Sequence, residues 1–191
     1  SPSDVVVCGD VVYVTGRESG NLVKIDVATG KIARSSPLRM NQTVYGADYD
    51  PSTGLLYIGT MSEGKVAVYD CARNRERTRI HIGGSPFRVV VDPDSHRVYV
   101  ACTGKRVNTI SVINTTNFKT LKPLHVGHNP AGMAVDPQTH RVLVTSRNDN
   151  IVSLVDPTTD HRRDIPVGRH PFRCAIDPVT NLGFVANAYE R

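Results

Sequence analysis

The stretch from 86 to 127 reads PFRVVVDPDSHRVYVACTGKRVNTISVINTTNFKTLKPLHVG. Turn residues divide it into four short runs rich in Val, Ile and Tyr, at 88–92, 97–102, 108–114 and 121–126. Apolar residues that alternate within short runs bounded by Gly, Pro, Asn and Asp are typical of antiparallel strands. The stretch therefore predicts a four-stranded meander, whose strands are named a to d in chain order.

The same unit recurs along the chain. An Asp-Pro pair closes strand a at Asp50, Asp92, Asp136 and Asp177, at intervals of 42, 44 and 41 residues. The core of strand b recurs as Tyr13-Val14-Thr15, Tyr57-Ile58-Gly59, Tyr99-Val100-Ala101, Leu143-Val144-Thr145 and Phe184-Val185-Ala186. A period near 40 residues with four strands per repeat indicates an all-β fold, the β-propeller. The blades are expected at 4–43, 44–85, 86–129 and 130–170, with a half blade at 171–191.

Several motifs of the third repeat match a known family. The Asp-Pro turn, the strand Arg97-Val98-Tyr99-Val100, the run Asn108–Ile113 and the Val-Gly-x-x-Pro link at 126–130 resemble the YVTN repeat of bacterial and archaeal β-propellers. The resemblance covers essentially the whole chain and implies a lactonase-like ring of seven blades. Propellers of this type serve as binding scaffolds, as subunits of larger enzymes and as enzymes, so the resemblance leaves the function open.

Four and a half blades do not close such a ring. At about 42 residues per blade, seven blades need roughly 300 residues, whereas the chain has 191. The repeat pattern begins with a whole blade and reaches only strand b of the fifth. We therefore expect an incomplete propeller, whose other strands are cleaved, disordered or supplied by a second chain.

Composition limits the partners and the compartment. The net charge of +5 permits anionic partners without identifying one. The sequence contains no run of about 18 apolar residues, so no membrane span is predicted. The four cysteines, Cys8, Cys71, Cys102 and Cys174, lie in different blades without metal-ligand spacing, so free thiols and no metal site are expected. Free thiols favour a reducing compartment, whereas the family resemblance implies a periplasmic or secreted protein; the localisation stays open.

The a–b turns share one special position. Gly54, His96, His140 and Asn181 occupy it, and Gly, Asn and His are enriched in left-handed backbone. We therefore interpret His96 and His140 as turn residues and not as metal ligands.

The opposite ends of the strands carry the candidate site. There the d–a links and b–c loops rim the channel of a propeller, and Pro-Phe-Arg places Arg88 and Arg173 where other blades have Gly46 and Gly132. The candidate ligand-binding residues are Arg88, Lys105, Arg106, His128, Asn129, Arg147, Arg169, His170 and Arg173. Arginine forks suit a carboxylate, a phosphate or an acidic peptide side chain. In the alternative interpretation, Arg88 and Arg173 pair with nearby carboxylates or line the channel with water.

The function predicted from this face is a binding scaffold for a protein partner or an anionic small molecule, with no cofactor. The first alternative is a lactonase-like hydrolase or lyase, in which His128 or His170 is the base and Arg88 or Arg173 stabilises the developing charge. No carboxylate stands out beside these histidines, which weakens that alternative. The second alternative is a propeller subunit of a larger redox enzyme. Nucleic acid is not expected, because the recurring aromatic residues are core positions.

Overall fold

A computed structural model gives the structure of the chain and describes residues 1–33, 38–39, 43–104 and 106–189. These residues form strands and one short 3-10 helix, η1 (Met61–Glu63). They divide into two compact units, Ser1–Val89 and Val90–Arg191, and the boundary falls inside strand β9 (Ser85–Asp92). Within the described part, no helix has the length and apolar character that a membrane span requires.

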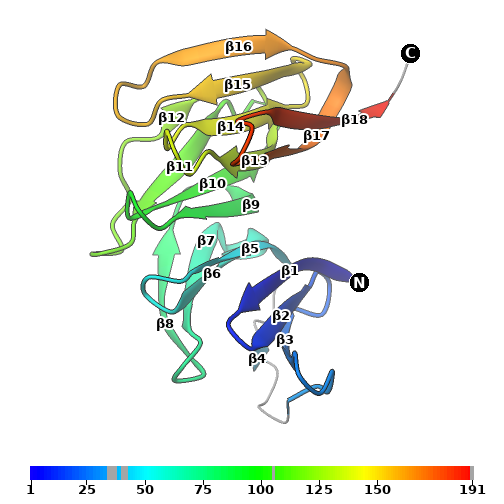
Figure 1. Ribbon diagram of the computed structural model, residues 1–191, viewed down its shortest axis with the longest axis vertical. Coiled ribbons are helices and arrows are strands. Elements are labelled where there is room, and N and C mark those ends of the chain that lie inside the picture. The colour runs from blue at the N-terminus through cyan, green and yellow to red at the C-terminus, as the bar shows by residue number, and fades with distance from the viewer. Residues whose placement is uncertain (34–37, 40–42, 105, 190–191) are drawn as a thin grey trace. The chain divides into compact units, whose positions relative to one another are not determined.

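The N-terminal unit contains the first two sheets (Figure 1). The first has the order β1-β2-β3-β4 and consists of β1 (Pro2–Cys8), β2 (Val11–Gly16), β3 (Asn21–Asp26) and β4 (Leu38–Arg39). The second has the order β5-β6-β7-β8 and consists of β5 (Val44–Asp50), β6 (Leu55–Thr60), β7 (Lys65–Asp70) and β8 (Arg75–His81). Sequential neighbours pair antiparallel in both sheets, which is the predicted meander.

Three more sheets follow (Figure 1). The third has the order β12-β11-β10-β9 and contains β10 (Arg97–Thr103), β11 (Thr109–Asn114) and β12 (Leu124–His125). The fourth contains β13 (Pro130–Val135), β14 (Val142–Ser146), β15 (Ile151–Val155) and β16 (Arg162–Pro166), in that order. The fifth is the hairpin of β17 (Arg169–Ile176) and β18 (Gly183–Tyr189). The described residues therefore contain four four-stranded blades and one two-stranded half blade.

Strand d of the third blade is shorter than expected. The sequence predicts it at 121–126, whereas the ladder to β11 contains Leu124–His125 and one isolated bridge between Ile113 and Thr120. Pro123 has no N–H to donate to a ladder, so it interrupts the pairing between these two contacts.

The a–b turns have the backbone that the sequence predicts. The φ angles of Gly54, His96, His140 and Asn181 are 71°, 54°, 56° and 56°, all left-handed. The Asp before the proline accepts hydrogen bonds from the following Ser or Thr, as when Thr53 Oγ1 donates to Asp50 at 2.8 Å. The carboxylate therefore fixes the turn while the left-handed residue reverses the chain.

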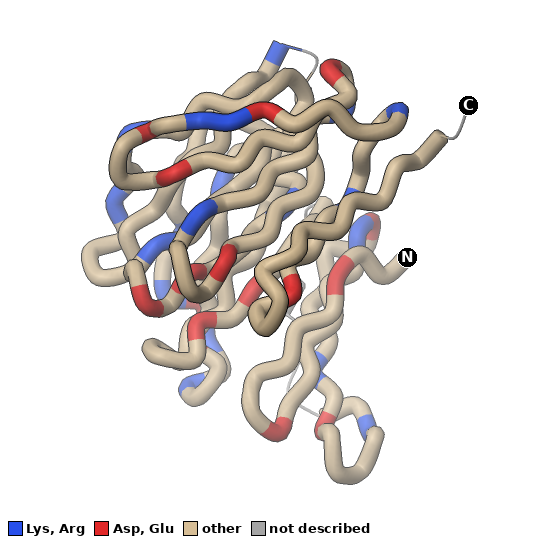
Figure 2. The backbone as a smooth tube through the Cα atoms, turned by 45° about the horizontal axis from the view of Figure 1, so that its top comes forward, with Lys and Arg blue, Asp and Glu red and all other residues tan. Residues whose placement is uncertain are grey.

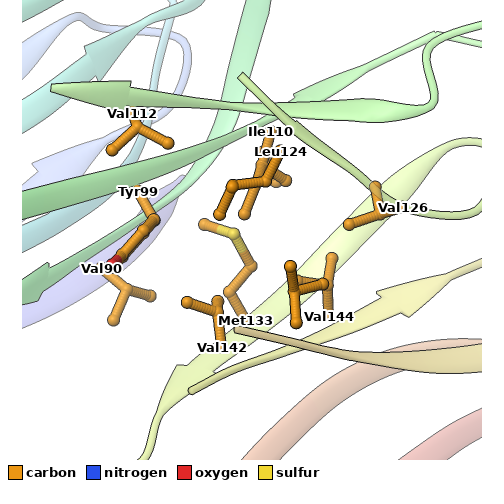
Figure 3. Close-up of a cluster of buried hydrophobic side chains, with 11 residues drawn as sticks. Val90, Tyr99, Ile110, Val112, Leu124, Val126, Met133, Val142 and Val144 are labelled. Carbon is orange, nitrogen blue, oxygen red and sulfur yellow. The ribbon is translucent and has the colours of Figure 1, made fainter. Parts of the chain in front are cut away.

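Each unit has its own apolar core between stacked sheets. In the N-terminal unit, Tyr13 and Tyr69 meet edge to face at 5.9 Å between ring centres, beside Leu56 and Ile58. In the C-terminal unit, Met133 points into a cluster formed by strands of the third and fourth blades (Figure 3). Tyr13, Tyr57 and Tyr99 are almost fully buried, which confirms the prediction that they are core, whereas the same prediction for Phe184 is wrong.

The fifth sheet leaves apolar side chains exposed that are buried in the complete blades. Among the described strands, β18 pairs with β17 alone. Its Phe184 is 58% exposed, although the equivalent Tyr57 and Tyr99 of complete blades are fully buried.

Candidate functional site

The loops of the C-terminal unit meet at one end of its strands, as the sequence predicts. The backbone N–H of Arg147 donates to Asn129 O at 3.2 Å, so the b–c loop of the fourth blade lies against the preceding d–a link. At the other strand ends, Thr115 N donates to His96 O at 3.0 Å and joins a c–d turn to an a–b turn. We call the first end the link face of this unit; it consists of residues 103–104, 106–108, 126–129, 146–150 and 166–170.

Strand a enters its sheet through an irregular pairing in the first, second, fourth and fifth blades. The register of the a–b ladder shifts between Pro2 and Asp4, Tyr45 and Ala47, Pro130 and Met133, and Pro171 and Arg173. Such bulges bend the strand and re-aim the neighbouring side chains. The repeat alignment places Asp4, Gly46, Arg88, Gly132 and Arg173 at one equivalent position beside this bend.

In the N-terminal unit this position holds an ion pair. Arg88 Nη1 lies 2.8 Å from Asp4 Oδ2, and the two side chains are 25% and 17% exposed. The same Asp4 oxygen accepts a 3.1 Å hydrogen bond from the backbone N–H of Ala47 on β5. Arg88 therefore pairs with a carboxylate, as the alternative interpretation of the sequence predicts, and its charge is balanced within the fold.

Glycine at the equivalent position makes a close backbone approach possible. A Cβ on Gly46 would lie 2.8 Å from the Cα of Arg88, and one on Gly132 would lie 2.9 Å from the Cα of Arg173. In both cases the backbone of the next Pro-Phe-Arg segment occupies the space that a side chain would need. The two Pro-Phe-Arg segments are thus held against a glycine in the same way, each within its own unit.

Two guanidinium groups stack on the Phe172 ring in the C-terminal unit. The Cζ atoms of Arg147 and Arg173 lie 5.1 Å and 5.4 Å from the centre of its ring. In the N-terminal unit, Arg17 lies 4.9 Å from the ring centre of Tyr45, which aligns with Phe172. Arginine in the b–c loop therefore stacks on the aromatic residue that begins the next blade. The sequence predicts Arg147 and Arg173 as site residues but gives no role to Phe172.

A carboxylate lies beside His128, contrary to expectation. Asp149 Oδ2 is 3.1 Å from His128 Nδ1 and accepts a 2.7 Å hydrogen bond from the backbone N–H of the same residue. Partial burial opposes ionisation of Asp149, but the two hydrogen bonds from His128 outweigh it and lower its pKa. The polar triplet Asn148-Asp149-Asn150 in the adjoining loop was the signal that could have identified this pair.

His170 has a different environment. Its backbone N–H donates to Asn150 Oδ1 at 3.0 Å, and its ring meets that of Tyr189 edge to face at 5.0 Å. Asn150 and Tyr189 also line a polar hollow of about 920 Å³, together with Asp149 and Arg169. Arg169 and His170 are exposed on the link face.

The remaining candidates differ in their roles. Asn129 has left-handed backbone, with φ of 57°, and its amide contacts Gly104 N and Asn148 Oδ1 at 3.4 Å and 3.2 Å. It therefore holds two loops together. Arg106 is exposed on the link face, and Lys105 lies outside the described residues.

The placement of charged and metal-ligating side chains bears on which ligands the chain could bind. Lys and Arg positions are interspersed with Asp and Glu positions along the backbone (Figure 2). Within the described ranges, no group of three or more His, Cys, Asp or Glu side chains is placed to hold a metal ion. The link face of the C-terminal unit contains His128, Asn129, Arg147, Arg169 and His170, and Arg173 lies beside Phe172 in the same unit, whereas Arg88 belongs to the N-terminal unit.

Comparison with known proteins shows the fold. No protein-family model and no curated protein matches the chain. A Kuenenia stuttgartiensis hydrazine synthase chain is 13% identical at a TM-score of 0.61, over 98% of this chain and 95% of that one. A chain of a nidogen/laminin complex is 14% identical at 0.82, over 97% and 72%. A chain of a mitotic checkpoint complex is 16% identical at 0.83, over 97% and 58%.

These similar structures are propeller folds. The present chain therefore has a β-propeller fold built of four-stranded antiparallel blades, as the sequence predicts. Membership of the YVTN-repeat family and a ring of seven blades stay predictions.

Proposed function

We propose that the chain is a binding propeller that recognises an anionic group of a protein partner at Arg147 and Arg173. The observation that carries this proposal is the convergence of both guanidinium groups on the Phe172 ring, at 5.1 Å and 5.4 Å. Stacking restricts the two long side chains before a ligand arrives, so binding loses less conformational entropy. A guanidinium offers a planar fork that matches a carboxylate or a phosphate.

The surroundings of Arg147 and Arg173 support an anion over a cation. Arg169 and His170 lie on the same link face, exposed to solvent. Arg88 belongs to the other unit and is paired with Asp4 at 2.8 Å. We expect affinity to depend on Arg147 and Arg173, because Phe172 brings these two guanidinium groups together.

The comparisons favour a protein as the source of the anion. The nidogen/laminin complex and the mitotic checkpoint complex are both assemblies of protein chains. By analogy of fold alone, the partner of this chain is a protein segment that presents Asp, Glu or a phosphorylated residue. A free anionic metabolite is the other outcome that a binding experiment distinguishes.

The test is an array of acidic, phosphorylated and neutral peptides, together with free phosphate and citrate. Binding of an acidic peptide should weaken about 30-fold in the variant Arg147→Ala/Arg173→Ala, because arginine hot spots contribute more than about 1 kcal/mol each. The matched control is Arg162→Ala/Arg163→Ala on β16, which removes the same charge from exposed positions. Equal weakening in both variants, or none in the first, would contradict the site.

A second candidate, a lactone-opening hydrolase, draws on the contact between His128 and Asp149. Asp149 holds Nδ1 at 3.1 Å, which leaves Nε2 to accept a proton. In this reaction the water oxygen attacks the lactone carbonyl while His128 takes its proton. The ring C–O bond then breaks, and the proton passes from His128 to the departing alkoxide.

A screen of lactones and esters tests this second candidate. Turnover should disappear in His128→Ala and fall in Asp149→Asn, mainly through kcat, because Asp149 orients and stabilises the imidazolium. His161→Ala, at an exposed turn of the same blade, is the control. Turnover that survives in His128→Ala would eliminate the hydrolase. The redox-subunit alternative has in its favour only the fold likeness to hydrazine synthase.

A further inference from the structure

Two cysteines of the N-terminal unit are neighbours in space. Cys8 ends β1 and Cys71 follows the last residue of β7, 63 positions later in the chain. Their Sγ atoms are 3.6 Å apart and share an S–H···S hydrogen bond. Packing of the first blade on the second therefore brings together two thiols that lie in different blades of the repeat.

The pair differs from the other two cysteines. All four thiols are free in the structure. Burial raises the pKa of Cys102 to about 11, and Cys174 Sγ lies 3.6 Å from the carbonyl oxygen of Leu143. Only the pair of Cys8 and Cys71, among the described thiols, shows an Sγ–Sγ contact.

The surroundings make Cys71 the more reactive partner. Cys71 is half-buried, whereas Cys8 is 8% exposed. The hydrogen-bond contact with Cys8 outweighs the effect of burial, and Tyr13 adds to it, so the pKa of Cys71 is lowered. The same contact and burial raise the pKa of Cys8. Two neighbouring thiols, one of them with a lowered pKa, are the arrangement that thiol–disulfide exchange uses.

We infer that Cys8 and Cys71 form a redox-active pair, which closes to a disulfide between the first two blades by exchange with a small-molecule disulfide such as oxidised glutathione. The Cys71 thiolate attacks one sulfur of the small disulfide, forms a mixed disulfide and releases one glutathione thiolate. The Cys8 thiol then gives up its proton to solvent, attacks Cys71 Sγ and releases the second glutathione. Two protein thiols are oxidised, and one small disulfide is reduced to two thiols.

The geometry requires little movement. Because a disulfide bond is about 2.05 Å long, the two Sγ atoms need to approach by about 1.5 Å from their present 3.6 Å. Both side chains pack in the cluster that contains Tyr13 and Tyr69. The closed disulfide joins the end of β1 to the second sheet and removes conformational freedom of a long loop from the unfolded chain.

The experiment equilibrates the intact chain in glutathione buffers of increasing oxidised fraction, then blocks free thiols and maps the disulfides by mass spectrometry. The expected result is a Cys8–Cys71 disulfide, with Cys102 and Cys174 still alkylated. Oxidation should raise the Tm by about 10 °C, in a way that dithiothreitol reverses.

Variants separate this pair from general oxidation. Cys71→Ser, at the half-buried position, should abolish both the disulfide and the rise in Tm, and Cys102→Ser/Cys174→Ser should preserve both. Should Cys71→Ser fail to fold, the disulfide map of the wild-type chain decides alone. Free Cys8 and Cys71 thiols in fully oxidised glutathione, or disulfides that involve Cys102 or Cys174 equally, would overturn the inference.

Discussion

Arg88 and Asp4 form an ion pair that connects the first and third predicted blades. Their closest atoms are 2.8 Å apart, and Asp4 also accepts a hydrogen bond from Ala47 on the strand that lies between them in the repeat. Both side chains are largely buried, at 25% and 17% exposure. The contact thus links three consecutive strands a within the N-terminal unit.

Breaking this ion pair should destabilise the chain. A double-mutant cycle of Asp4→Asn and Arg88→Met is expected to give a coupling energy of about 1–3 kcal/mol, because each single change leaves a partly buried charge unpaired. Urea unfolding measures it. The control cycle is Lys122→Met and Asp160→Asn; that pair has a lysine that is 75% exposed, and a coupling below about 0.5 kcal/mol is expected. Equal coupling in the two cycles would contradict the structural role of Arg88.

Gly46 should not tolerate a side chain. A Cβ there would meet Arg88 Cα, Phe87 O and Val89 N at 2.8 Å, and φ is +28°. Gly46→Ala is therefore expected to lower the free energy of unfolding by about 1–3 kcal/mol more than Gly54→Ala. Gly54 also has positive φ, at +71°, but no atom lies within 4 Å of its added Cβ. The difference between the two variants in urea unfolding isolates the steric clash from the backbone strain.

The repeat could be predicted because its signals are local. Asp-Pro turns, alternating strands and the left-handed position of Gly54, His96, His140 and Asn181 all lie within a few residues of one another, and all four φ angles are as expected. A local signal is sufficient because turn chemistry and strand alternation depend on neighbouring residues alone.

Contacts between blades could not be predicted from the sequence. Asp4 lies in a strand a, β1, that ends without an Asp-Pro pair, so its equivalence to Arg88 is not apparent from motifs. Asp149 beside His128, Phe172 beneath Arg147, and Cys71 beside Cys8 each join residues that are 21 to 63 positions apart. Such pairs depend on how one sheet packs on the next, which a single sequence does not encode in its motifs.

His140 should contribute a stabilising contact that its equivalent His96 lacks. His140 Nδ1 lies 3.0 Å from the buried carboxylate of Asp92, which belongs to the preceding blade. Asn keeps the left-handed backbone but loses this contact, so His140→Asn should destabilise the chain by about 1 kcal/mol. His96→Asn should be nearly neutral, since the His96 side chain is exposed. Similar losses of unfolding free energy in both variants would refute the contribution of the contact.

Two core tyrosines should respond differently to loss of the hydroxyl. Tyr57 is fully buried, and its hydroxyl has no hydrogen-bond partner among the described residues. Tyr57→Phe should therefore be neutral or stabilising, because it removes an unsatisfied polar atom. Tyr69 donates to Asn74 Oδ1 at 2.6 Å, and Tyr69→Phe should cost about 1 kcal/mol. Thermal unfolding of the two variants in parallel checks the contrast, and the reverse order would contradict it.

Acid should weaken the fold through its turn carboxylates, and Asp156 is the clearest case. Hydrogen bonds from the Thr158 hydroxyl and backbone N–H, at 2.6 Å and 2.9 Å, lower its pKa to about 2. Because the folded pKa lies below the ordinary value of 3.8, the unfolded chain takes up the proton first as pH falls. The stabilisation is therefore fully present above about pH 4 and is lost as pH falls toward 2.

Asp156→Asn removes this titration. Its Tm should fall less between pH 5 and pH 2 than that of the wild-type chain. Part of the acid sensitivity should remain, because hydrogen bonds from Thr29 and Thr180 also lower the pKa values of the turn carboxylates Asp26 and Asp177. Asp94→Asn, at an exposed turn position, is the control and should follow the wild type. Identical acid profiles for Asp156→Asn and the wild type would show that this turn makes no ionic contribution to stability.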